Sequence, residues 1–299
     1  MTTTSRQDRR VRTRPRANAS AVVGRVLQDA ARRLHEVANG DLSAKSLHDL
    51  RIACRRAEAG LRLCQDAADS RACRWLKRRL QTLRRACNPA RDDDVLRKWV
   101  QRHDTSSNKP LQRAIRAHRE KVQPRIEKLA RRLSEDHRFE RRSQKVVKQL
   151  RVCELKSQMA QVFGQRLFDE VYRFVKSLPA KRDDVATLHR LRIIGKRLRY
   201  ASELVTEIWP DVELAELNEH LHLLQDRLGA IHDLFVGASR LQKRPPHRSV
   251  RVVRLLVQKA QDTATRLQRK FWRWWQASPI ERMLADTTAE VVTLMNMKS

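Results

Sequence analysis

The chain has 299 residues, of which 65 are Lys or Arg and 34 are Asp or Glu, so its formal net charge at pH 7 is +31. Hydrophobic residues still make up 40% of the sequence and recur with helical spacing, which excludes a wholly disordered chain. No apolar run reaches the length of a membrane span. A positive charge this large repels itself unless anions lie nearby, so the composition predicts a polyanionic partner.

Residues 1–17 contain six arginines and no apolar segment, which is not the pattern of a secretory signal. We expect a disordered basic tail there. From residue 18 onward the apolar residues follow a helical period, and no stretch alternates convincingly as a strand would. Helices are predicted near residues 20–37, 44–66, 70–87, 91–103, 110–135, 155–178, 184–208, 211–229, 231–242, 248–276 and 279–295.

Proline and glycine separate these helices, since both residues interrupt a helical backbone. Breaks are expected at Asn39-Gly40-Asp41, Asn88-Pro89, 106–110, Leu178-Pro179, Trp209-Pro210 and Pro245-Pro246. Short connections favour antiparallel neighbours, so the sequence predicts an all-α fold of up-down helical bundles.

Two of the predicted helices carry a strongly basic face. At about 100° per residue, a first basic stripe falls within an arc of about 60° and consists of His48, Arg51, Arg55 and Arg62. A second basic stripe falls within about 80° and consists of His189, Arg192, Lys196 and Arg199. Apolar residues occupy the opposite side of each helix, which is typical of a helix packed on one face.

The two stripes are copies of one pattern. His189 follows His48 by 141 residues, and the same offset relates Arg51 to Arg192, Arg55 to Lys196, Asp92 to Asp233 and Val95 to Val236. No insertion disturbs this register, so we predict an internal duplication. Repeat one would span about residues 20–153 and repeat two about residues 155–295. Each would hold about four long helices, with residues 136–154 as the junction.

The pattern H-x-x-R-[IV]-x-x-[RK]-R occurs at 48–56 and again at 189–197, each time followed by a second motif, at 91–95 and more weakly at 232–236. Together these motifs resemble the CHAD family, the conserved histidine α-helical domain, over about residues 18–295. The resemblance implies two four-helix bundles related by a pseudo-twofold axis, around a central basic cavity that binds inorganic polyphosphate. It also implies an association with polyphosphate granules and their proteins. The candidate polyphosphate ligands are His48, Arg51, Arg55, Arg56, Arg62, His189, Arg192, Lys196, Arg197 and Arg199.

One departure from the repeat bears on this cavity. Glu58 stands where Arg199 stands in the second copy, so we expect walls of unequal charge and a weaker role for Arg199 as a ligand.

Polyphosphate has no bases or sugars that a protein could recognise, so its binding site needs positive charges arranged in a row. Guanidinium forks match phosphate oxygens, and an ammonium group acts as a mobile point charge.

His48 and His189 each begin a stripe, where a bound phosphate would favour the charged imidazole. Alternatively, each is a buried residue bonded to a carboxylate such as Asp92 or Asp233. We interpret these two aspartates as structural partners of the basic side chains. No catalytic residue, metal or cofactor is expected, and the chain is predicted not to be an enzyme.

Two other functions remain open. An HD-type metal phosphohydrolase could use His189, His220, His222 and His232-Asp233, but the position equivalent to His232 is Arg91, and Arg is not a metal ligand. A nucleic-acid binder would suit the net charge, yet Tyr200 is the one aromatic residue beside the stripes, and single-strand binders generally stack bases on aromatic platforms.

Two further groups of residues bear on compartment and packing. The five cysteines, which are odd in number and lack C-x-x-C spacing, are expected to be small buried thiols: Cys54, Cys64, Cys73, Cys87 and Cys153. They favour a reducing compartment, and so a cytoplasmic location, within which the CHAD resemblance implies polyphosphate granules. The aromatic run at 271–275 is expected to close the core rather than to form a surface patch.

Overall fold

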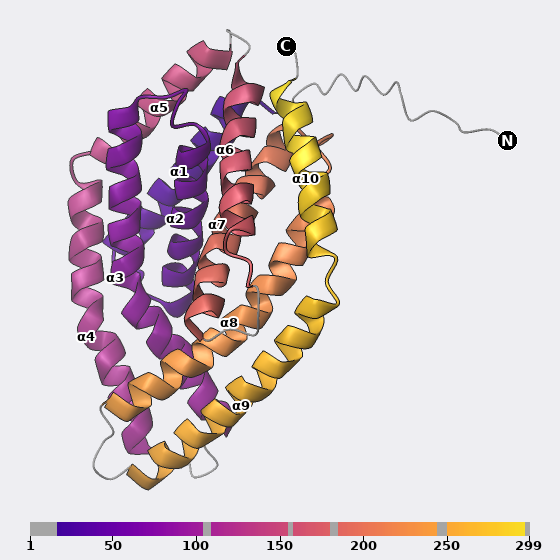
Figure 1. The fold of residues 1–299 in the computed structure, drawn as a ribbon. Helices are drawn as coiled ribbons and strands as arrows, with labels where there is room; N and C mark the ends of the chain where they lie inside the picture. Colours follow the sequence, from indigo (N-terminus) through magenta and orange to yellow (C-terminus); the bar gives the residue numbers. More distant parts are fainter. Residues whose placement is uncertain (1–16, 104–108, 155–157, 180–184, 244–249, 297–299) are drawn as a thin grey trace, which may run out of the picture.

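The computed structural model describes residues 17–103, 109–154, 158–179, 185–243 and 250–296, and no β-strand occurs among them (Figure 1). Of the tail expected at residues 1–17, all but Ala17 lies outside these ranges. The helices are α1 (Ala19–Ala38), α2 (Ala44–Leu63), α3 (Ser70–His103), α4 (Lys109–Ser134), α5 (Arg138–Glu154), α6 (Met159–Val175), α7 (Val185–Ile208), α8 (Ala215–Lys243), α9 (Val250–Gln276) and α10 (Ile280–Met295). The prediction of an all-α fold is confirmed.

Local signals set the start of α2, which carries the first basic stripe. Gly40 adopts a φ of 96°, a conformation that favours glycine, and so turns the chain after α1. The Ser43 hydroxyl then accepts a hydrogen bond from the Ser46 backbone N–H at 3.1 Å, which caps α2. The break expected at Asn39-Gly40-Asp41 is therefore confirmed.

The break expected at Asn88-Pro89 is wrong, because α3 continues through it. A proline inside a helix costs about 3 kcal/mol. Here the turns on both sides are held by packing, since Cys87 and Ala90 are completely buried. Tertiary hydrogen bonds add to this: Arg51 donates to the Asn88 side chain, and Arg240 donates to the Pro89 carbonyl at 3.1 Å. The helices predicted at 211–229 and 231–242 are likewise one helix, α8.

Residues 136–154 are not a simple junction. They contain α5, which packs against α1 as α10 packs against α6. Phe139, Val146 and Leu150 of α5 are buried in the core. Within the described residues, each half of the chain therefore has five helices. The internal duplication itself stays a prediction, and so does the superposition of the two halves.

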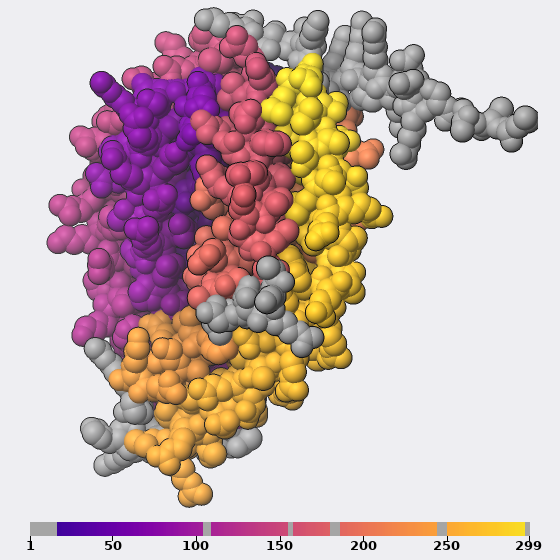
Figure 2. All heavy atoms as spheres, viewed as in Figure 1, coloured from indigo at the N-terminus to yellow at the C-terminus, as the bar shows by residue number. Residues whose placement is uncertain are grey.

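The halves share one body. A large apolar core lies between helices of both halves, from α1 to α3 and from α6 to α8. A second apolar cluster joins the ends of α3 and α4 to α8 and α9, and includes Val100, Ile115, Leu234 and Val257. Figure 1 shows these four helix ends side by side at the lower end of the molecule. Figure 2, viewed from the same side as Figure 1, shows the N-terminal helices on the left of the molecule and α9 and α10 on the right.

A close helix contact brings the two basic stripes together. α7 packs against α2, α6 and α8. At the contact with α6 and α8, a Cβ atom on Gly195 would lie 3.0 Å from Leu224 and 3.3 Å from Phe174, so a larger residue would force these helices apart. Leu191 and Leu198 are completely buried on the same face of α7. The polar face of α7 is thereby fixed beside that of α2.

The remaining structural expectations concern cysteines, aromatic residues and membrane spans. All five cysteines are free, four are buried and Cys153 is half-buried. Phe271 and Trp272 are buried in the core, and Trp274 stacks on His220 with ring centroids 4.6 Å apart, so the aromatic run closes the core as expected. In the described ranges no helix has both the length and the apolar character needed to cross a membrane.

Candidate functional site

A cavity of about 420 Å³ lies between α2, α3 and α7. Seven of its eleven lining residues are Lys or Arg, and one is Glu. The lining consists of Arg55, Glu58, Arg62, Lys77, Gln81, Arg84, Arg192, Ile193, Lys196, Arg197 and Tyr200. We call it the basic cavity.

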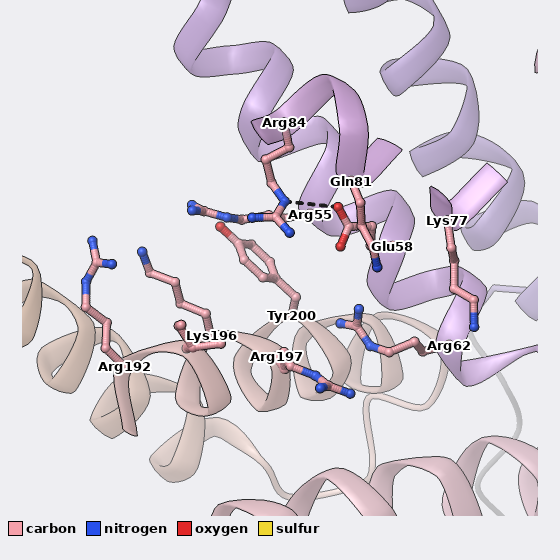
Figure 3. Close-up of a pocket in the computed structure, with 11 residues that line it drawn as sticks. Arg55, Glu58, Arg62, Lys77, Gln81, Arg84, Arg192, Lys196, Arg197 and Tyr200 are labelled. Carbon is pink, nitrogen blue, oxygen red and sulfur yellow. Dashed lines mark hydrogen bonds and ion pairs between the residues drawn. The ribbon is translucent and has the colours of Figure 1, made fainter. Parts of the chain in front are cut away.

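The basic cavity joins the two stripes. Arg55 and Arg62 of the first stripe line it together with Arg192 and Lys196 of the second. Figure 3 shows Arg192 and Lys196 rising from α7 towards Arg55, while Arg62 and Arg197 lie near each other at the other end. Arg55 and Arg192, which are 137 positions apart in sequence, therefore line one cavity.

The third wall, from α3, was missed by the sequence analysis. Lys77, Gln81 and Arg84 line the cavity from this helix. Their spacing of four and three residues places them on one helical face, which was a usable signal. Arg84 donates to Glu58 at 3.0 Å, and this buried carboxylate is the acidic group of the cavity lining. The expected inequality of the two walls is thus present, because α2 contributes a carboxylate and α7 does not.

A smaller cavity of about 170 Å³ continues the basic lining towards α6. It shares Arg62, Lys77 and Arg197 with the basic cavity. At its α6 side, the buried Glu170 forms ion pairs with Arg197 at 2.9 Å, Arg173 at 3.1 Å and Arg62 at 3.5 Å. The cations thus form a line longer than one cavity, and Glu170 neutralises part of it.

Burial and crowding perturb these cations. Burial, followed by the charges of Arg55 and Arg192, lowers the pKa of Lys196 to about 6. Burial also lowers the pKa of Arg51 to about 10, and it lowers those of Arg55 and Arg192. Burial disfavours the charged form of a base, and neighbouring positive charges do the same. The site therefore concentrates more positive charge than its own carboxylates balance.

Several guanidinium nitrogens in this region are buried without a hydrogen-bond partner. Among the described residues these include the Nε atoms of Arg192 and Arg197. Buried N–H groups in folded proteins are nearly always paired, so such atoms call for an explanation. An anion with several acceptor oxygens would satisfy them and would balance the local charge.

The histidines lie beside the basic cavity rather than in its lining. His189 Nδ1 is 3.3 Å from His232 Nδ1, with ring centroids 4.8 Å apart. Burial lowers the pKa of both, that of His232 to about 4, and burial followed by the charge of Arg91 lowers the pKa of His48. In the described part of the chain, no hydrogen bond joins His48 or His189 to Asp92 or Asp233. Asp92 pairs instead with Arg240 at 3.3 Å.

Comparison with known proteins bears directly on this arrangement. The model of the CHAD domain matches residues 21–242, which is most of the chain. The chain belongs to the CHAD domain family. A crystal structure of the CHAD domain from the plant Ricinus communis is 21% identical, with a TM-score of 0.56 over 94% of this chain and 93% of that chain. PptA from Streptomyces chartreusis is 15% identical, with a TM-score of 0.58 over 87% of this chain and 100% of that chain. Among the curated proteins, none matches.

Three arginines among the candidate ligands do not line the basic cavity: Arg51, Arg56 and Arg199. Arg51 donates to the Asn88 side chain. Arg56 lies one residue past Arg55, about 100° around α2, and pairs with Glu207 at 3.7 Å. Arg199 pairs with Glu203 at 2.8 Å and lies over the ring of Tyr200 at 4.3 Å. Arg56 and Arg199 are thus both paired with carboxylates of the protein outside the cavity lining.

The residues of the metal-phosphohydrolase hypothesis are not gathered in one place. His220 bonds to Ser278 at 3.0 Å, and His222 lies 3.1 Å from a Glu203 oxygen, while His189 contacts His232. Within the described ranges of this CHAD chain, no group of three or more His, Cys, Asp or Glu side chains is arranged to hold a metal ion.

Proposed function

We propose that this CHAD chain binds inorganic polyphosphate in the basic cavity. The observation that carries the proposal is the lining of this cavity, in which seven Lys and Arg side chains from three helices face a single carboxylate. Partnerless Nε atoms in the same lining supply donors that phosphate oxygens accept. The CHAD resemblance points to the same ligand.

A chain of phosphates fits this site better than a single phosphate ion. The basic cavity and its smaller continuation share Arg62, Lys77 and Arg197, so cations line a continuous path. An extended anion can contact many of them at once, and a cleft lined by one sign of charge concentrates the opposite charge. We place Arg55, Arg192 and Lys196 in the middle of this path.

Several candidate ligands lie outside the basic cavity. His48, Arg51 and His189 extend the path beyond the cavity, where the charge of Arg91 already acts on His48 and Arg51. Arg56 and Arg199 are assigned no direct contact, since both are held by carboxylates. The proposal is for binding and not for catalysis, in the cytoplasm and on polyphosphate granules.

The test compares two triple variants that each replace two arginines and one lysine with glutamine. Arg55→Gln, Arg192→Gln and Lys196→Gln change the basic cavity, whereas Arg251→Gln, Arg254→Gln and Lys259→Gln change exposed positions on α9. Charge-assisted hydrogen bonds contribute about 1.5 to 3 kcal/mol each, so the cavity variant should bind polyphosphate at least about a hundredfold more weakly. The α9 variant should lose only a few-fold, because exposed charges are screened.

Equal losses in both variants would mean diffuse electrostatic binding and would defeat the proposal. The titration is repeated with single-stranded RNA at equal phosphate concentration, since nucleic acid is the competing polyanion. Tyr200, the aromatic residue of the cavity, already lies under the Arg199 guanidinium, so we expect polyphosphate to compete better. Preferential RNA binding would replace polyphosphate with nucleic acid as the ligand.

A further inference from the structure

A second cavity of about 410 Å³ lies between α3, α8 and α9 and has a different character. Its walls are largely aliphatic and include Val95, Leu96, Leu234 and Leu267. We call it the apolar cavity. Gly237 and three alanines of α8 and α9 also line it and take up little of its space. Its volume falls in the range typical of small-molecule sites.

A few polar and aromatic groups lie within this apolar lining. The half-buried Trp99 stacks with His103, their ring centroids 4.7 Å apart and their planes at 22°. Thr263 contributes a hydroxyl that accepts a hydrogen bond from Arg266 at 3.2 Å. A flat heteroaromatic ring could stack on Trp99 and bond to these polar groups. Apolar walls with a few placed polar groups are the usual design of a specific ligand site.

Charges at the edge of the apolar cavity favour an anionic ligand. The lining contains Arg91, Lys98 and Arg102 against a single carboxylate, Asp233. All three cations belong to α3, and from Arg91 to Arg102 this helix extends about 16 Å. The cavity is therefore elongated, with positive charge along one wall.

The apolar cavity adjoins the end of the polyphosphate path. Arg91 lines the cavity and also acts on His48 and Arg51, whose pKa values are lowered first by burial and further by its charge. Asp233, on the opposite wall, opposes the effect of burial on the pKa of Arg192. The residue before Asp233, His232, touches His189 of the second stripe. A ligand can thus lie partly in the apolar cavity and partly along the stripes.

We propose that the apolar cavity binds the base of a nucleoside oligophosphate, whose phosphate chain runs past Arg91 and Arg51 towards Arg192. This rests on the proposed function, because the phosphates occupy the same path as polyphosphate. It adds a second ligand class and a preference: a phosphate chain that ends in an aromatic base binds better than a bare chain of equal length. The base stacks on Trp99 and the phosphates meet the cations.

The test measures adenosine 5′-triphosphate and tripolyphosphate by calorimetry without magnesium. Tripolyphosphate carries at least as much negative charge, so electrostatics alone favours it. Base stacking on an aromatic side chain is strong enough to give at least about a tenfold advantage to the nucleotide. The variant Ala230→Phe fills the apolar cavity from an exposed position and should remove this advantage while tripolyphosphate affinity stays unchanged. Ala215→Phe, exposed on the same helix and outside the cavity, should keep it.

Each outcome decides the proposal. It is overturned if the nucleotide binds no tighter than tripolyphosphate, including the case where neither binds, or if Ala230→Phe leaves the advantage intact. Thr263→Phe, which fills the cavity from α9, replaces Ala230→Phe if the latter loses its helical signal. Long-chain polyphosphate is titrated in parallel: its binding without any nucleotide preference defeats this inference alone, whereas its failure to bind defeats the proposed function.

Discussion

Replacing Lys196 with Met should abolish a proton uptake that accompanies polyphosphate binding. In the ligand-free protein, burial and the charges of Arg55 and Arg192 lower the pKa of Lys196 to about 6. At pH 7 about nine tenths of this side chain is therefore neutral. A phosphate chain beside it favours the ammonium form and raises its pKa. Binding at pH 7 should thus take up about 0.9 proton at this position.

The sign of the pH dependence follows from this uptake. Because the complex holds more protons than the free protein, affinity should fall as pH rises above about 6, by up to about tenfold per pH unit. Below pH 6 Lys196 is already charged and its contribution levels off. His48, His189 and His232 also have lowered pKa values, so Lys196 should dominate between pH 7 and 8.

Calorimetry in buffers of different ionisation enthalpy counts the protons directly. Wild type should show the uptake, Lys196→Met should lose it, and Lys259→Met, which removes an exposed lysine on α9, should keep it. If wild type takes up no proton at pH 7, or if Lys196→Met takes up as many as wild type, then Lys196 does not meet the ligand and the electrostatic reasoning fails.

Three further predictions concern salt, histidines and the buried acid. Each neutralised phosphate contributes about −0.7 to the slope of the logarithm of the binding constant against the logarithm of the salt concentration. Contacts from the basic cavity should therefore give a negative slope of several units, and a slope near zero rules out the mechanism. His48→Gln with His189→Gln should flatten the pH profile of binding below about pH 6.5, and an unchanged profile makes both histidines structural. Glu170→Gln should raise polyphosphate affinity several-fold and lower the melting temperature, because it releases Arg62 and Arg197; weaker binding by the folded variant refutes this.

Helical periodicity explains why most of the site could be predicted from sequence. Once α2 and α7 are helices, Arg55 and Arg62 must share a face, and so must Arg192 and Lys196. The predicted internal repeat then indicates that the two faces belong to one site. The spacing of Lys77 and Arg84 places both on one face of α3, but it does not indicate that this face meets the stripes, because that contact arises from tertiary packing.

Tertiary contacts explain where the structure departs from the sequence analysis. Arg56 and Arg199 match the motif or the stripe but lie outside the lining of the basic cavity, paired with Glu207 and Glu203, and their role as ligands stays a prediction. At Pro89, local propensity predicts a break, and burial of the neighbouring turns overrides it. α5 was interpreted as a junction although its buried residues, such as Val146 and Leu150, follow a helical period.

The two basic stripes differ at one position in how their charge is expected to respond to a ligand. Arg55 of the first stripe corresponds to Lys196 of the second. An arginine at this depth stays charged, since even the buried Arg51 has a pKa of about 10, whereas Lys196 can give up its proton and relieve the repulsion. The charge of Arg55 on α2 is therefore constant, whereas the charge of Lys196 on α7 depends on whether a phosphate ligand is bound.

Lys196→Arg tests this distinction. The variant should lose the proton uptake at pH 7, as Lys196→Met does, but unlike Lys196→Met it should bind polyphosphate at pH 8 at least as tightly as wild type. Its ligand-free form should melt at a lower temperature than wild type, because a permanent charge now adds to the repulsion from Arg55 and Arg192, and polyphosphate should restore more stability to it. A ligand-free variant as stable as wild type would show that the cations of the basic cavity do not strain the fold.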